Sequence, residues 1–212
     1  MRTLSTLAAI AVLAFTLDGA QAQDRTPEGP TSLATVLRAP GVSARAWSAI
    51  VVHHSASRSG SVASIDDFHR RVRGFPRGLA YHFVIGNGRG LGDGVIEAGP
   101  RWTRQQPGAH VASSLRDADT HALWDDVAIG IVLIGNFEET APTERQVASL
   151  TQLVGALRRR FHIAPSRVLG HGGVAGAHTE CPGNSLDAIV HRLAAEPTAP
   201  PPARIRRRRQ RR

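Results

Sequence analysis

The feature that most restricts the fold is VAIGIVLIG, residues 127–135, a run without a single polar side chain. A short apolar run of this kind, rich in β-branched residues, indicates a strand that is covered on both faces. A second such run, AIVVHHSAS at residues 49–57, stops at small polar residues, as a buried strand does where it enters a loop. Two strands of this type need helices on both sides of their sheet, which favours an α/β fold.

Further strands and helices are expected to alternate along the chain. Residues 64–74 have apolar side chains at helical spacing after Ser64, a candidate N-cap, and residues 143–161 begin with a capping box at Thr143. The remaining expected elements are strands at 79–86, 94–99 and 167–170 and a helix at 185–194. The glycines of residues 86–92 indicate a hairpin turn and not a phosphate loop, because no Lys-Ser or Lys-Thr follows them. The pattern predicts one α/β domain with a central mixed β-sheet flanked by helices.

The first 22 residues have the organisation of an export signal. Arg2 provides a positive charge, residues 4–17 form a mainly apolar stretch, and Ala20-Gln21-Ala22 forms a small-residue cleavage site. A membrane anchor is the alternative, but the apolar run is shorter than the ~20 residues that span a bilayer, and Asp18 interrupts it. We therefore expect an exported bacterial protein, periplasmic or secreted, with residues 1–22 removed.

Composition divides the rest into a linker at 23–45, one domain at 46–194 and a basic tail at 195–212, rich in proline and arginine and expected to be disordered. The net charge of +9 suggests a nucleic-acid binder, but seven of the 26 basic residues lie between Arg204 and Arg212. The domain itself is close to neutral, so no nucleic-acid partner is expected. The tail either solubilises the protein or adheres to anionic envelope polymers or lipids. We expect a monomer.

The chain has one cysteine, Cys181, in the stretch HTECPG. An exported protein with one cysteine cannot form an intramolecular disulfide, so the thiol is either buried and inert, paired with another chain, or bound to a metal. Pro182 and Gly183 indicate a turn, and two histidines stand at expected strand ends, His53 after one strand and His171 after another. Two imidazoles and one thiolate suit Zn2+ and leave a fourth position for water, as a catalytic zinc site requires.

Two neighbouring histidines compete for these positions. His53 and His54 point to opposite faces of a strand, so only one of them can face the metal. His178 lies three residues before Cys181, which is also a workable ligand spacing, whereas His171 directly follows the strand at 167–170.

Four motifs, VVHHSAS, AYHFVIG, AIGIVLIGNF and GHGGVAGAHTECPG, occur in an order and at separations that resemble the type-2 family of zinc-dependent N-acetylmuramoyl-L-alanine amidases, which includes the peptidoglycan recognition proteins. The resemblance covers roughly residues 46–193. It implies that the metal ligands are His53, His171 and Cys181.

The resemblance also implies catalytic roles for Tyr81 and Thr179, and a place in the substrate groove for His110. The implied reaction is zinc-assisted hydrolysis of the amide between N-acetylmuramic acid and L-alanine in peptidoglycan. Two alternatives stay open: a non-catalytic peptidoglycan receptor, from which loss of the cysteine ligand is expected, and a polyanion-binding protein that acts through its tail.

Overall fold

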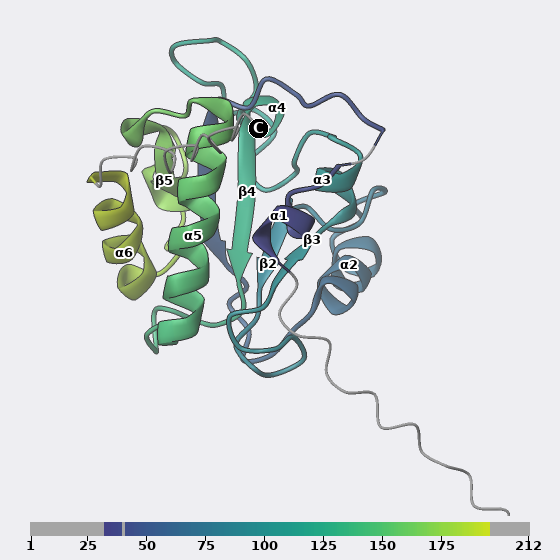
Figure 1. Cartoon of the computed structure of the whole chain (residues 1–212), viewed down its shortest axis with the longest axis vertical. Helices are drawn as coiled ribbons and strands as arrows, with labels where there is room; N and C mark the ends of the chain where they lie inside the picture. The colour runs from purple at the N-terminus through teal and green to yellow at the C-terminus, as the bar shows by residue number, and fades with distance from the viewer. Residues whose placement is uncertain (1–31, 40, 196–212) are drawn as a thin grey trace, which may run out of the picture.

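The computed structural model describes residues 32–39 and 41–195 (Figure 1). Its elements are, in chain order, α1 (Leu33–Val36), β1 (Ala49–His54), α2 (Val62–Arg71), β2 (Phe83–Ile85), β3 (Ile96–Ala98), α3 (Pro100–Thr103), α4 (Trp124–Val127), β4 (Ala128–Leu133), α5 (Glu144–Phe161), η1 (Pro165–Arg167), β5 (Val168–Gly170), η2 (His171–Gly173) and α6 (Asn184–Ala195).

The strands form one mixed sheet in the order β3-β2-β4-β1-β5. β1 is parallel to both β4 and β5, β2 is parallel to β4, and β3 is antiparallel to β2. Every residue of β4 is buried, as predicted for the central strand. The β2–β3 pair is the predicted hairpin across the glycine-rich turn. The α/β fold with a mixed sheet is therefore confirmed.

The larger core lies on the face of the sheet that α5 and α6 cover; Figure 1 shows α5 running alongside β4. Alternate residues of β1 and β4, such as Ile50, Val52 and Ile131, pack there against Leu153 and Leu157 of α5. All of these side chains are essentially inaccessible to solvent. Each contributes about 1.5–3 kcal/mol of burial free energy, so this face anchors the sheet.

The opposite face of the sheet carries the intervening residues. Ala49 and Val51 of β1 pack against Trp124 on this side, and Val132 of β4 belongs to a cluster that Ile65 of α2 covers. Because side chains alternate along a strand, His53 lies on the same face as Ala49 and Val51. The sheet thus presents His53 away from α5 and toward α2.

The described part of the expected linker is not a simple spacer. Ser32 caps the single turn of α1, and Val36, only 8% exposed, packs into the larger core. The Arg160 side chain of α5 donates a hydrogen bond to the Leu37 carbonyl oxygen at 2.7 Å. Apolar residues at positions 33, 36 and 37 explain this packing, and they stand inside a segment whose Pro, Ser and Gly content indicated a linker.

The expected export signal and nearly all of the basic tail lie outside the described residues. In the part of the chain that the structure describes, no helix has the length and apolar character needed to cross a bilayer.

Two sequence-based boundaries differ from the structure. The strand expected at 79–86 is formed only over Phe83–Ile85. The backbone N–H groups of Leu79 and Ala80 donate to side chains of α2, whereas those of His82 and Gly86 still donate to the carbonyl oxygens of Gly130 and Val95. The N-cap of α2 is Ser61 and not Ser64. The Ser61 and Ser64 side chains accept hydrogen bonds from each other's backbone N–H groups, which completes a capping box.

Candidate metal centre

Three possible metal ligands meet where the carboxyl ends of β1 and β5 form one edge of the sheet. His53 is near the end of β1, His171 opens η2 directly after β5, and Cys181 lies in the loop before α6. Their ligand atoms all lie within 4.8 Å of one another. The Cys181 Sγ is 3.6 Å from the His53 Nδ1, and the His53 and His171 ring centroids are 4.6 Å apart.

A short backbone hydrogen bond closes the loop that carries two of these residues. The Gly172 N–H donates to the Cys181 carbonyl oxygen at 2.6 Å, which holds His171 and Cys181 side by side. A side chain at position 172 would meet the Thr179 carbonyl oxygen at 3.0 Å, so glycine suits this close approach. The competing residue, His178, is exposed and is not part of the cluster. Of the two candidates, the structure therefore places His171, the histidine that follows β5, beside His53 and Cys181.

Burial controls the charge of the three side chains. It lowers the pKa of His53 well below its usual value, and the neighbouring His110 and His171 lower it further. Burial and the proximity of His110 lower the pKa of His171 to about 4. The pKa of the Cys181 thiol rises to about 11, again mainly through burial. At neutral pH both imidazoles are thus uncharged and offer lone pairs, and the thiol needs a cation to ionise it.

A cavity of about 870 Å³ opens beside the ligand cluster. His53, His171, Cys181, Tyr81 and Thr179 all line it. The Tyr81 ring centroid is 5.0 Å from that of His53, and the Thr179 Oγ1 accepts a hydrogen bond from the Cys181 N–H at 3.1 Å. A second cavity of about 570 Å³ shares His110, His171 and Thr179 with the first.

His69 of α2 also lines the larger cavity, and the sequence did not single it out. Its Nδ1 accepts the Ala80 N–H at 3.0 Å, so the proton of the neutral ring is on Nε2. Burial lowers the pKa of His69, which favours this neutral form. The sequence offered one signal for His69: it lies in the expected helix, four residues after Ile65 and next to Phe68. Its bond to Ala80 could not be predicted, because that bond depends on how α2 packs.

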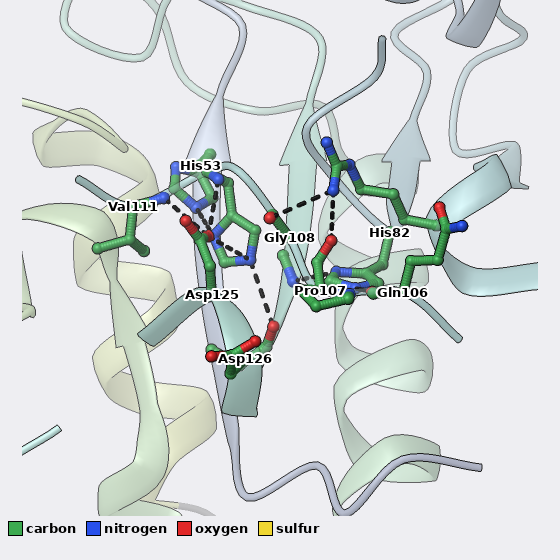
Figure 2. A network of polar contacts seen from close by, with 12 residues as sticks. His53, His82, Gln106, Pro107, Gly108, Val111, Asp125 and Asp126 are labelled. Carbon is green, nitrogen blue, oxygen red and sulfur yellow. Dashed lines mark hydrogen bonds and ion pairs between the residues drawn. The ribbon is translucent and has the colours of Figure 1, made fainter. Parts of the chain in front are cut away.

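His110 is among the residues that line both cavities, and its ring packs against the ring of His53. Its Nδ1 is 3.0 Å from the His53 Nε2, and its Nε2 is 3.3 Å from the Ala128 carbonyl oxygen. Asp125 accepts hydrogen bonds from the backbone N–H groups of His110 and Val111 (Figure 2). None of the His110 side-chain surface is exposed.

The comparisons with known proteins agree with this geometry. A family model described as N-acetylmuramoyl-L-alanine amidase matches residues 43–184. The chain belongs to this amidase family. The match spans β1 through the start of α6 and includes every residue of the ligand cluster.

Relatives of this amidase family include both enzymes and recognition proteins. The chain is 26% identical to peptidoglycan-recognition protein SC1a of Drosophila melanogaster over 145 residues, 64% of this chain and 68% of the relative. The structure of the N-acetylmuramoyl-L-alanine amidase LysC from Clostridium intestinale superposes with a TM-score of 0.56 at 29% identity, covering 72% of this chain and 88% of that one. A mutant of Drosophila PGRP-LB, solved in complex with tracheal cytotoxin, gives a TM-score of 0.50 at 26% identity, with 69% and 82% covered.

The six residues predicted from sequence lie in one region of this amidase fold. His53, His171 and Cys181 form the cluster, and Tyr81 and Thr179 line the cavity beside it. His54 has a separate contact: its Nδ1 accepts the Phe137 N–H at 3.4 Å. The roles of all six stay predictions. His110 is among the residues that line both cavities, and its ring also bonds to His53.

Proposed function

We propose that the protein hydrolyses the amide between the lactyl group of N-acetylmuramic acid and the L-alanine of the stem peptide. The observation that carries the proposal is the convergence of two neutral imidazoles and one thiol on a cavity large enough for a muropeptide segment. The bound tracheal cytotoxin in the PGRP-LB relative supports a peptidoglycan fragment as the ligand.

The ligand set fits Zn2+. With Zn–N and Zn–S bonds of about 2.0–2.3 Å, neighbouring ligand atoms of a tetrahedral site are about 3.3–3.8 Å apart. The 3.6 Å between the Cys181 Sγ and the His53 Nδ1 falls in this range, and all three ligand atoms lie within 4.8 Å of one another. Two histidines and one cysteine would leave a fourth position for water, the ligand count of a catalytic zinc site and not of a structural one.

Zinc held by His53, His171 and Cys181 would supply a Lewis acid that activates water near neutral pH and polarises the scissile carbonyl. The chain's own residues stabilise the charge that develops on that carbonyl oxygen. Burial raises the pKa of Tyr81, so its hydroxyl stays protonated and can donate a hydrogen bond. Thr179 already accepts from the Cys181 N–H through Oγ1, which leaves its hydroxyl proton free to donate into the cavity.

The test is product analysis with purified muropeptides. Wild-type protein with zinc should release the intact stem peptide with a new L-alanine amino group, together with a saccharide that has a free lactyl carboxyl group. Cys181→Ser should release neither product, because it loses the thiolate ligand. His178→Ala is the matched control, since His178 is exposed and outside the ligand cluster, and it should cleave like wild type. Muropeptide that binds the wild-type protein and stays intact would make the protein a receptor.

We also propose, from the sequence, that residues 1–22 direct export to the bacterial envelope and that residues 204–212 adhere to anionic polymers or lipids there. The support is the signal-like organisation of the first segment and the seven arginines of the last. Each arginine near an anionic membrane contributes about 1 kcal/mol, which salt screens. Deletion of 204–212 should therefore weaken binding to anionic vesicles most at low salt, without changing cleavage of small muropeptides. Equal binding with and without these residues would leave the tail a solubilising end.

A further inference from the structure

We infer that His110 is a positioning residue that fixes the tautomer and ring orientation of the metal ligand His53. The inference rests on the proposed zinc site, but it concerns how the chain prepares that site before any substrate binds. It gives His110 a role through His53, where the family resemblance implied a contact with substrate.

The hydrogen-bond donors can be assigned from one end of the network. The Ala128 carbonyl oxygen can only accept, so the His110 Nε2, 3.3 Å away, must carry the proton. A neutral His110 then has a bare Nδ1, which can only accept, and the His53 Nε2 at 3.0 Å must donate to it. His53 in turn has a bare Nδ1. This is the nitrogen that faces the Cys181 Sγ at 3.6 Å.

A backbone carbonyl on β4 thereby determines which nitrogen of His53 is free to bind metal. Without His110, the His53 ring could carry its proton on Nδ1 or rotate by half a turn, and either change removes the lone pair from the metal position. Histidines that bind metals usually donate their second N–H to a carboxylate, a carbonyl or water, and loss of that partner typically weakens metal binding 10–100-fold. Here another imidazole accepts that N–H.

The surroundings of His110 are built to hold its ring in place. The Asp125 Oδ1 accepts the backbone N–H groups of His110 and Val111 at 2.9 and 3.2 Å, and it lies 3.8 Å from the His110 Nε2. Two glycines make room for the ring. A Cβ at Gly130 would lie 2.3 Å from the His110 Cδ2, and one at Gly108 would lie 2.4 Å from the same atom. None of its side-chain surface is exposed, so the ring is held in place to support His53.

The test compares two substitutions of His110. Gln offers a carbonyl oxygen to accept from His53 and an N–H to donate to Ala128, so His110→Gln should keep zinc affinity within about threefold of wild type. His110→Leu fills a similar volume but offers neither group, and it should weaken zinc binding about 10–100-fold. Zinc affinity is measured by competition with a chromogenic chelator, with zinc alone and no substrate.

A second readout reports the tautomer directly. In the metal-free protein, long-range ¹H–¹⁵N correlation spectra should show His53 protonated at Nε2 in wild type and in His110→Gln. In His110→Leu they should show a mixture of the two tautomers. If His110→Leu only disturbed the packing, zinc affinity would fall but His53 would stay protonated at Nε2.

His82→Leu is the matched control for loss of a buried histidine. His82 is completely buried and uses both ring nitrogens, accepting from the Gly130 N–H and bonding to the Gln106 carbonyl oxygen, but it bonds to no member of the ligand cluster (Figure 2). The His82→Leu variant should keep the zinc affinity of wild type and the wild-type tautomer of His53.

Three results would overturn the inference: wild-type affinity and tautomer in His110→Leu, equal losses in His110→Leu and His110→Gln, or equal losses in His110→Leu and His82→Leu. Wild-type protein that binds no zinc would instead refute the proposed function, so the two failures are distinguishable.

Discussion

We expect the hydroxyl of Tyr81 to act on the proposed reaction without holding the metal. Its ring lies 5.0 Å from that of His53 at the wall of the cavity. Burial, with a smaller contribution from Cys181, raises the pKa of Tyr81, so the hydroxyl is a proton donor throughout the neutral range. A hydrogen bond that strengthens as charge develops on the carbonyl oxygen accelerates the reaction without tightening substrate binding.

Tyr81→Phe removes this donor and keeps the ring. We expect turnover to fall roughly ten- to a thousand-fold, the range for loss of one oxyanion donor, while zinc content stays near that of wild type. Steady-state kinetics on a purified muropeptide and metal analysis of the same sample measure both quantities. An unchanged turnover number would reduce Tyr81 to a packing residue.

At the scale of single residues, the sequence predicted which side chains meet at the candidate metal site, but not which of their atoms form hydrogen bonds. His53, His171 and Cys181 could be found because two stand at the ends of apolar strands and the third is the only cysteine. The bond between His53 and His110 joins residues 57 positions apart, and it depends on how the loop before β4 packs. No local pattern encodes such a contact.

At the scale of elements, α2 positions the segment that carries Tyr81. Two of its side chains, one helical turn apart, accept consecutive backbone N–H groups: the Asp66 Oδ1 accepts from Leu79 at 2.7 Å, and the His69 Nδ1 accepts from Ala80 at 3.0 Å. Arg70 holds the Asp66 carboxylate at 2.6 Å. The helix thus takes the place of a neighbouring strand just before Tyr81.

Asp66→Ala should lower the free energy of unfolding by about 1–3 kcal/mol, because it leaves the Leu79 N–H without its partner. Urea denaturation of the metal-free protein measures this loss. Asp67→Ala is the matched control: Asp67 forms an exposed (i, i+4) pair with Arg71, and such pairs contribute only about 0.3–0.5 kcal/mol. Equal losses in the two variants would show that Asp66 is only a surface charge.

The same helix shows why boundaries were harder to predict than elements. The capping box of α5 was predicted correctly because Thr143 and Gln146 stand directly before a strongly periodic segment. In α2 both Ser61 and Ser64 are capping residues in one box, and sequence alone favoured the second. The strand at 79–86 was overestimated at its start, because the backbone N–H groups of Leu79 and Ala80 bond to α2 and not to a neighbouring strand.

At the scale of the whole molecule, the mixed sheet collects the site from distant parts of the chain. β1 and β5 are adjacent and parallel although more than 100 residues separate them, so His53 and His171 emerge at the same edge. The sequence predicted the central strand and the single domain, because two long apolar runs leave few alternatives. It missed the docking of α1, whose few apolar residues are surrounded by typical linker composition.

The central claim is that this edge of the sheet holds a catalytic zinc ion. The most direct measurement is a titration of metal-free wild-type protein with zinc while hydrolysis of a purified muropeptide is followed.

The rate should rise in proportion to added zinc, reach a plateau at about one equivalent per chain and stay near zero in His53→Ala and Cys181→Ser, because each variant lacks one of the three ligands. Full hydrolysis by metal-free protein, or tight binding of one zinc without any hydrolysis, would contradict the claim.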